Sequence, residues 1–318
     1  MPDNLRDKPT LVISLVSPTQ GQQNLELSYL TAGLSWRADY VAELNADDNL
    51  LDLNGWVTLI NQSGAAYPQA KLQLVAGDLN RVQENQSNPR AMMTMAAKVA
   101  DAAEMQQESL FEYHLCTLQR PTSLAENQTK QVALLSASGV PARKELLLRG
   151  ADYYYSSSYG DLGQKIKVSV FVEFDNKETS KLGMPLPKGI MRVYKKDSQG
   201  NAQFVGEDHI DHTPKNETVR LKLGEAFDIT ADKKQTDFKI LPRPSKGSSA
   251  FESAYEIVLK NAKRERVTVT VQEPIPADWH IINESQTSTK ASSNTAVWKI
   301  DIPAEGKTTL TYRVQVTY

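Results

Sequence analysis

The sequence predicts an all-β protein. Apolar and polar residues alternate with a period of two along many segments, which is the pattern of a strand with one buried face. At the C-terminus this alternation places five apolar side chains on one face: Leu310, Tyr312, Val314, Val316 and Tyr318. Strands with one apolar face suit antiparallel sheets packed in pairs. We therefore expect serial immunoglobulin-like or fibronectin-like β-sandwich modules.

A second observation is a repeated unit in which an alternating strand ends in asparagine and a polar turn follows. The three strands cover residues 53–61, 166–176 and 255–261. After each turn comes a further strand-like segment, at residues 71–75, 189–194 and 266–271. An asparagine at a strand end can bond its side chain to the following backbone, and it tolerates the left-handed conformation. The repeat therefore predicts a structural role for Asn61, Asn176 and Asn261.

Shorter alternating runs fill much of the remaining chain. Near the start, Leu25, Leu27 and Tyr29 fall on one face. Later runs have their apolar positions at Val219, Leu221 and Leu223, at Val267, Val269 and Val271, and at Ala296, Trp298, Ile300 and Ile302. Residues 197–201, Asp-Ser-Gln-Gly-Asn, lie between two strand-like runs and predict a hairpin turn.

Residues 84–108 interrupt the β pattern. From Ala91 to Gln107 the chain has no Gly or Pro, is rich in Ala, Met, Gln and Glu, and holds four of the seven methionines. These residue types favour helix, so we interpret residues 84–108 as an inserted helical or flexible segment. A Met-rich surface that contacts a partner is the functional alternative.

Residues 242–249, Pro-Arg-Pro-Ser-Lys-Gly-Ser-Ser, are the clearest linker signal in the chain. They set off a C-terminal immunoglobulin-like β-sandwich at residues 249–318. A softer break near residue 125 divides the rest. We expect an N-terminal β module at residues 1–125, which contains the insertion, and a central β-sandwich at residues 126–248.

The composition is ordinary for a folded protein of 318 residues, with 40% hydrophobic and 23% charged residues. A formal net charge of -2 gives no overall basic character, so we expect no nucleic-acid partner. No apolar run approaches roughly 18 residues, and we predict no transmembrane segment. The single cysteine, Cys116, excludes an intrachain disulfide. The first residues lack the apolar stretch of a signal peptide, so we expect either a cytoplasmic chain or a fragment of a longer exported protein.

An ordered set of motifs carries a family resemblance. Two of them are Tyr-Leu-Thr-Ala-Gly-Leu-Ser-Trp-Arg-Ala-Asp-Tyr at 29–40 and Leu-Gly-Met-Pro-Leu-Pro-Lys-Gly-Ile-Met-Arg-Val-Tyr at 182–194. The others lie at residues 61–64, 72–77, 129–132, 204–214 and 223–228. Together they resemble the bacterial proteins grouped as domain of unknown function 4139, to which the mucoidy inhibitor A-like proteins belong. The resemblance covers nearly the whole chain.

The resemblance implies a location more than an activity. Family members are often longer, with an N-terminal β domain ahead of this region, and many carry an export signal. This chain is similar to the C-terminal part of such a protein, which implies the periplasm or cell envelope. No catalytic residue is established for the family, so none is carried over.

Residues 207–212, Glu-Asp-His-Ile-Asp-His, are the densest group of metal-binding side chain types. On a strand, Glu207, His209 and Asp211 would share one face, and carboxylates and imidazoles so close could bind Zn²⁺ or Mn²⁺. A metal-dependent hydrolase is therefore the enzymatic alternative. The structural interpretation, which we favour, is a strand end where His and Asp side chains satisfy backbone groups.

Four tyrosines in a serine-rich run form a candidate binding surface: Tyr153, Tyr154, Tyr155 and Tyr159. Tyrosine offers a large contact area with a polar tip, which suits a glycan or a protein partner. The structural alternative is a sandwich edge at which alternate tyrosines pack inward.

The remaining candidates have structural interpretations. His114 and Cys116 would share a strand face about 7 Å apart, and we expect Cys116 to be a small core residue. We expect the tryptophans to anchor apolar cores; they are Trp36, Trp56, Trp279 and Trp298. A local basic patch is predicted to be solvated surface; it comprises Lys233, Lys234, Lys239, Arg243 and Lys246.

These observations favour a non-enzymatic cell-envelope module that mediates protein interaction or assembly and uses no cofactor. Its partner is expected to be another protein or a second copy of the chain. The alternatives are the metal-dependent hydrolase at residues 207–212 and a glycan-binding module at the tyrosine segment.

Overall fold

The computed structural model describes residues 12–18, 20–77, 105–242 and 249–318. Strands dominate these residues, and the helical part is limited to two short 3₁₀ turns, η1 (Asp152–Tyr155) and η2 (Glu178–Ser180). The predicted all-β class is confirmed. No helix in these four ranges is long and apolar enough to cross a membrane.

The first half of the chain contributes nine strands, which form most of the N-terminal lobe and lead into the second lobe. They are β1 (Leu34–Leu44), β2 (Leu50–Asn61), β3 (Tyr67–Ala70), β4 (Gln73–Ala76), β5 (Met105–Leu110), β6 (Tyr113–Leu118), β7 (Thr122–Leu124), β8 (Thr129–Arg149) and β9 (Asp161–Asp175). The second half contributes β10 (Gly189–Lys196), β11 (Ala202–Ile210), β12 (Thr218–Leu241), β13 (Ala250–Asn261), β14 (Val267–Pro274), β15 (Asp278–Glu284), β16 (Thr289–Ser292), β17 (Thr295–Ile302) and β18 (Gly306–Thr317).

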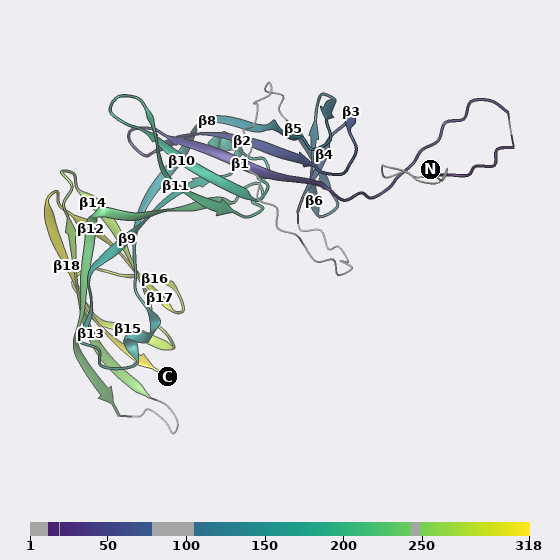
Figure 1. The fold of residues 1–318 in the computed structure, drawn as a ribbon. Coiled ribbons are helices and arrows are strands. Elements are labelled where there is room, and N and C mark those ends of the chain that lie inside the picture. Colours follow the sequence, from purple (N-terminus) through teal and green to yellow (C-terminus); the bar gives the residue numbers. More distant parts are fainter. Residues whose placement is uncertain (1–11, 19, 78–104, 243–248) are drawn as a thin grey trace, which may run out of the picture.

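One large sheet runs through the whole molecule in the order β11-β10-β1-β2-β8-β9-β12-β13-β18-β15, and β14, β16 and β17 complete it. Two small sheets, β3-β7 and β4-β6-β5, lie at the end of the N-terminal lobe. Figure 1 shows two lobes that meet at a bend, with β13–β18 in the second lobe. The long strands β8, β9 and β12 pass from one lobe to the other.

The described residues form two apolar cores, one in each lobe. The first contains Tyr40, Leu53 and Leu186, and the second contains Trp298 and Ile257. The shared strands serve both cores. The first takes Ala142, Val172 and Leu221 from β8, β9 and β12, and the second takes Leu146, Val168 and Ile229 from the same strands. Residues of the expected central module are thus divided between two cores. The three-module division and its immunoglobulin-like character stay predictions.

Two expectations about local structure are wrong. Residues 25–29 form no strand and lie exposed, because no strand in the described part of the chain pairs with them. Of the predicted insertion at 84–108, residues 84–104 lie outside the described residues, while 105–108 belong to β5. Met105 is buried in the first core, where pairing with β6 overrides helix propensity. Most of the predicted linker, residues 243–248, also lies outside the described ranges.

The predicted hairpin at residues 197–201 is confirmed. It joins β10 to β11, and the Asp197 amide donates to the Asn201 carbonyl at 2.9 Å. The Asp197 side chain accepts hydrogen bonds from the amides of Gln199 and Asn201, each at 2.9 Å. An aspartate that bonds to backbone two residues ahead is a common means of closing a turn.

The three repeated asparagines have the same buried hydrogen-bond pattern. Asn261 donates from Nδ2 to the carbonyls of Glu265 at 2.8 Å and Pro303 at 3.0 Å. Its Oδ1 accepts from the amide of Lys263 at 3.0 Å. One side chain therefore satisfies three backbone groups, two in the loop that follows it and one in a loop distant in sequence. The predicted structural role is confirmed here.

Asn61 and Asn176 repeat this arrangement with other partners. The Nδ2 of Asn61 donates to the carbonyls of Ala65 and Ala125, each at 2.8 Å. That of Asn176 donates to Met184 at 2.7 Å and Pro214 at 3.0 Å. Oδ1 accepts from the Ser63 amide in the first case and the Gly183 amide in the second. We call each of these arrangements an asparagine clamp.

Each clamp joins two neighbouring antiparallel strands at the same end. Ala125, Pro214 and Pro303 lie just ahead of β8, β12 and β18, the strands that pair with β2, β9 and β13 respectively. The register places Ile60 opposite Thr129, Asp175 opposite Thr218 and Asn261 opposite Gly306. The clamp therefore fixes where a pair of strands begins. None of the three asparagines has a positive φ, so the left-handed conformation is not part of their role.

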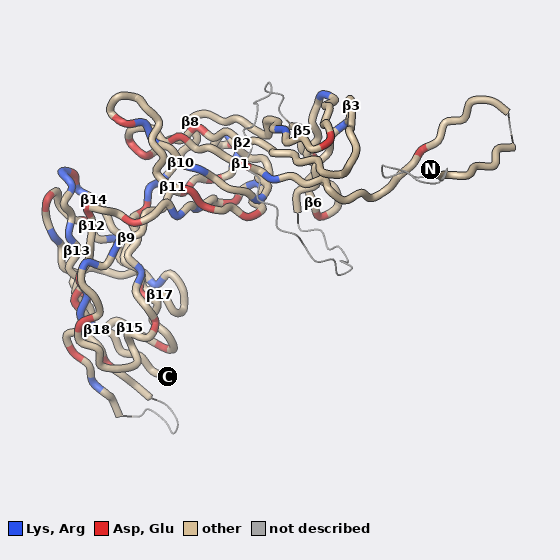
Figure 2. Tube along the Cα trace, in the orientation of Figure 1, with Lys and Arg blue, Asp and Glu red and all other residues tan. Residues whose placement is uncertain are grey.

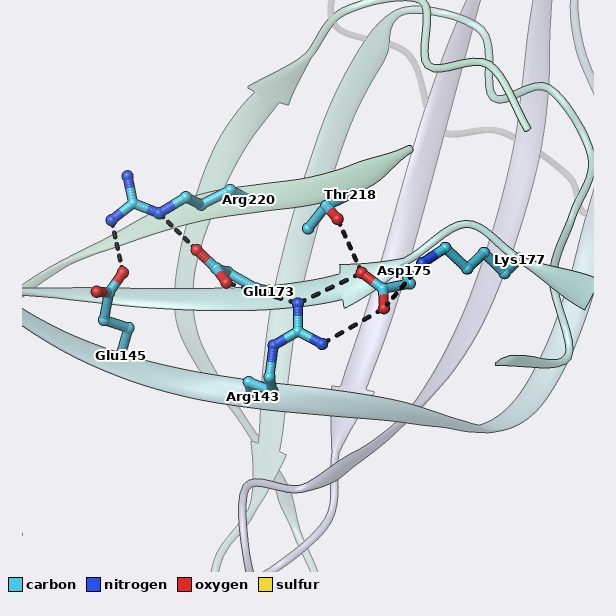
Figure 3. A network of polar contacts seen from close by, with 7 residues as sticks. All are labelled: Arg143, Glu145, Glu173, Asp175, Lys177, Thr218 and Arg220. Atoms are coloured by element: carbon cyan, nitrogen blue, oxygen red, sulfur yellow. Dashed lines mark hydrogen bonds and ion pairs between the residues drawn. The ribbon is translucent and has the colours of Figure 1, made fainter. Parts of the chain in front are cut away.

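Positions with charged residues of both signs are interspersed along the trace in both lobes (Figure 2). On one face of β8, β9 and β12 they form a cross-strand network (Figure 3). Arg220 pairs with Glu145 at 2.6 Å and with Glu173 at 2.7 Å, and Arg143 reaches Asp175 at 3.3 Å. The Arg143 hydrogen bond, with a further one from Thr218, lowers the pKa of Asp175. This network joins the strands that the two lobes share.

We predict that Asn176→Ala destabilises the protein by at least about 2 kcal/mol, because it leaves two carbonyls and one amide of a closed loop without partners. Asn176→Asp is expected to be no better, since a carboxylate would face the carbonyls of Met184 and Pro214. Unfolding in urea, followed by circular dichroism, measures the change. Asn283→Ala, at an exposed strand position, is the matched control. A wild-type midpoint for Asn176→Asp would show that the amide donor is not needed.

Candidate functional site

The predicted metal cluster does not converge. Strand β11 ends at Ile210, so Asp211 lies beyond the strand and does not continue the alternation. Glu207 pairs with Arg192 at 3.2 Å on the neighbouring strand β10. Among the described residues, no three His, Cys, Asp or Glu side chains lie close enough to hold a metal ion. The structure therefore does not bring Glu207, His209 and Asp211 together.

The structural interpretation of this segment agrees with the contacts. The Asp208 carboxylate accepts a hydrogen bond from the Lys222 amide at 2.7 Å, which ties β11 to β12. His212 Nδ1 accepts from the Lys188 amide at 3.2 Å. Both side chains satisfy backbone groups next to the strand end, as expected for this motif.

The four candidate tyrosines are divided between surface and core. Tyr153 and Tyr159 are exposed and contact each other, with ring centroids 5.4 Å apart. Tyr155 is completely buried, because the turn η1 directs it into the second core. Its hydroxyl donates to Glu273 Oε2 at 2.9 Å and lies 2.9 Å from the Tyr312 hydroxyl. Tyr155 is thus not available to a surface ligand, and Tyr154 is only partly exposed.

Tyr155 belongs to a buried ion pair that sequence reasoning missed. Lys233 Nζ lies 2.6 Å from both carboxylate oxygens of Glu273, and the two side chains are 2% and 1% exposed. The ammonium group also lies over the ring of Tyr154, 4.3 Å from its centroid. The prediction that Lys233 belongs to a solvated basic patch is wrong. The sequence did contain a signal for this burial. Lys233 continues the alternation of Ile229 and Ala231, whose side chains are buried.

Burial decides the electrostatics of this cluster. It lowers the pKa of Lys233, while the attraction of Glu273 opposes that change. Burial, with the charge of Glu273, also raises the pKa of Tyr155 and Tyr312 well above the usual value. The phenols therefore stay protonated and act as neutral donors around the carboxylate. Gly150 is required here, because a Cβ at that position would lie 2.1 Å from Glu273 Oε2.

We call Lys233, Glu273, Tyr155 and Tyr312 the buried polar cluster. It links β12, β14, β18 and the turn η1 inside the second core. Its charged groups are satisfied by one another and closed to solvent. The cluster therefore connects the turn η1 to three strands inside the second core.

The cysteine prediction is confirmed, and the tryptophan prediction is confirmed for two of the four residues. Trp56 is only partly buried and belongs to neither core. Cys116 is buried in β6, and burial raises the pKa of its thiol to about 11. A thiol in this state is a poor nucleophile. Trp279 and Trp298 are buried in the second core. Trp36 differs, because it packs against the first core and also lines a groove.

This groove is an apolar hollow on the described surface, with a volume of about 400 Å³. It lies where the start of β1 and the end of β2 meet the two small sheets. Its apolar lining comprises Leu34, Trp36, Leu59, Ile60, Tyr67, Ala70, Leu72, Leu74, Val75 and Leu124. We call it the β1–β4 groove. Apolar hollows of this kind bind ligands when they are left open.

One wall of the β1–β4 groove is the edge of a sheet. Five consecutive residues, 71–75, line it. Side chains of a strand alternate between two faces, so an unbroken run of lining residues indicates that the backbone edge faces the groove. In the described part of the chain, β4 pairs with β6 alone. Among the described residues, no strand pairs with the other edge of β4, which is thus an edge of its small sheet.

An exposed apolar segment begins at the mouth of the groove. Residues 25–33, which we call the arm, precede β1 and run away from the lobe (Figure 1). Leu25, Leu27 and Tyr29 are 60%, 49% and 65% exposed. The arm is fixed at its base, because the Gln62 amide donates to the Gly33 carbonyl at 2.6 Å. Gly33 has φ of 81°, and a Cβ there would lie 2.4 Å from the Gln62 carbonyl oxygen.

The described residues define an all-β protein with two lobes, one large sheet that runs through both lobes, two small sheets, and an apolar groove beside the β4 edge. The model of a protein family described as Domain of unknown function (DUF4139) matches residues 25–318. The chain therefore belongs to this family, as its motifs predicted. A search of curated proteins found no match.

We predict that Lys233→Met costs about 3–5 kcal/mol of stability, because Glu273 then stays buried without its counter-ion. Lys234→Met is the matched control. Lys234 is the next residue along β12, exposed and paired with Glu256 at 2.8 Å, so its loss is expected to cost under about 1 kcal/mol.

The double variant Lys233→Met/Glu273→Gln is expected to lose less than the sum of its two single variants. Urea unfolding followed by tryptophan fluorescence gives the three free energies. Additive losses would contradict a direct interaction between the two groups.

Proposed function

We propose that this chain is a non-enzymatic module of the bacterial cell envelope that mediates protein interaction or assembly, and that the β1–β4 groove is its binding surface. The observation that carries the proposal is the combination of an apolar lining with the open edge of β4. An extended peptide added to such an edge gains backbone hydrogen bonds along its length. Its apolar side chains gain burial in the groove.

The polar candidates support an architectural role in place of catalysis. The Lys233–Glu273 pair lies inside the second core, where both side chains are almost completely buried. Glu207 and Asp208 hold neighbouring strands. The exposed Tyr153 and Tyr159 remain the residues of the glycan alternative.

The envelope location rests on the family resemblance, because many such proteins are exported. Fractionation of cells that carry a tagged copy of the natural gene tests it. We expect the tagged protein in the periplasmic or envelope fraction. Recovery with a cytoplasmic marker protein would contradict the location and leave the groove proposal standing.

We predict that panning a library of random heptapeptides against the purified chain enriches sequences with alternating apolar residues. Leu34→Asp is expected to abolish this enrichment, since it places a charge in the groove lining. Leu50→Asp is the matched control, because Leu50 also begins a strand and is 41% exposed against 44% for Leu34. Isothermal titration calorimetry gives the affinity of each peptide. Equal enrichment by the wild type and Leu34→Asp would overturn the groove as the binding surface.

A further inference from the structure

We propose that the arm of one chain occupies the β1–β4 groove of a second copy, so that the chain forms a dimer by reciprocal exchange. This inference rests on the proposed function, because it names the occupant of the same groove. The occupant is residues 25–30, added as a strand to the open edge of β4.

The arm has the chemistry that the groove requires. Its alternating positions Leu25, Leu27 and Tyr29 are apolar and exposed. An extended segment of this pattern is stable only when its apolar face is covered. The groove offers an apolar lining and a strand edge with which no described strand pairs. Residues 25–30 in extended form span roughly 20 Å, which is enough to cover β4 at about 13 Å.

The charges agree with this pairing. Glu26 is the single charged residue of the arm. Lys71 lines the groove beside β4 and is exposed. A strand laid along β4 therefore brings one negative and one positive side chain to the same end of the molecule, where their attraction favours docking.

The geometry favours a second copy over the arm's own groove. The arm leaves the lobe at Leu34, which is itself part of the groove lining. The hydrogen bond from Gln62 to Gly33 fixes the base of the arm, and residues 25–30 run outward from there (Figure 1). Since each chain presents one arm and one groove, two copies can satisfy each other around a two-fold axis. Exchange of an identical element between protomers is an established route to dimers.

The mass of the full chain in solution is the first test. Size-exclusion chromatography with light scattering is expected to give twice the 35.3 kDa of one chain. Leu25→Asp/Leu27→Asp is expected to raise the dimer Kd at least tenfold. Ser28→Asp is the matched control, because it adds a charge to the opposite face of the same segment and is expected to leave the dimer intact. A chain that is still monomeric at about 100 μM would overturn the proposal, and so would a dimer that the double substitution leaves unaffected.

Cysteine cross-linking identifies which groove is occupied. A Leu27→Cys chain is mixed with a Gln73→Cys chain and oxidised, and we expect a disulfide-linked dimer on a non-reducing gel. The native Cys116 is buried and does not compete. Lys299→Cys, on the exposed face of β17, replaces Gln73→Cys in the control and is expected to give no linked dimer. If the chain that carries both Leu27→Cys and Gln73→Cys links only to itself, the arm fills its own groove and the exchange proposal fails.

The two proposals fail in distinguishable ways. A monomeric chain that still selects alternating apolar peptides keeps the groove as a binding surface and rejects the exchange. If the chain dimerises through the arm but selects no peptide, the groove binds the arm of a second copy and is not a general peptide-binding surface. A monomer that selects no peptide rejects both.

Discussion

The whole structure depends on backbone pairing along the three strands that both lobes share. β12 pairs with β9 from Thr218 and with β13 from Ile229, so one strand carries hydrogen bonds of both lobes. Separating the lobes would expose unpaired backbone groups, which is costly. The register of β12 against β9 shifts between Lys222 and Gly224 and again between Glu225 and Thr230. Bulges of this kind bend and twist a strand, and here they lie where β12 leaves the first core for the second.

Buried polar groups determine the register in which these strands pair. An asparagine clamp is stable only when two carbonyls and one amide reach the same side chain, so it selects one start for a strand pair. The buried polar cluster acts similarly in the second lobe, because a charge inside a core must meet its partner. Such groups contribute less net stability than apolar packing does. Their main effect is to make alternative registers unfavourable.

The end of the N-terminal lobe differs from the rest of the structure, because a strand edge there borders a groove. At this end two small sheets lie beside the large sheet, and the edge of β4 borders an apolar groove. Natural proteins usually protect such an edge with charge, proline or a covering segment. In this chain an apolar arm extends from the same place, and in the dimer that we propose the arm covers the groove. The groove and the arm thus connect the fold to the proposed role in assembly.

The sequence by itself determined the strand class, the structural role of the three strand-end asparagines, the hairpin at residues 197–201 and the family. These depend on alternation and on hydrogen bonds to nearby backbone, which a short segment already contains, whereas the distant carbonyl of each clamp was decided by the tertiary structure. Only the tertiary structure decided which faces are covered. Lys233 is buried because Glu273, forty residues away, lies opposite it, and Tyr155 is buried because η1 turns toward Tyr312. Leu25, Leu27 and Tyr29 have the pattern of a strand yet lack a partner strand. Alternation tells which side chains share a face, but the neighbour that covers that face is fixed by contacts far apart in the chain.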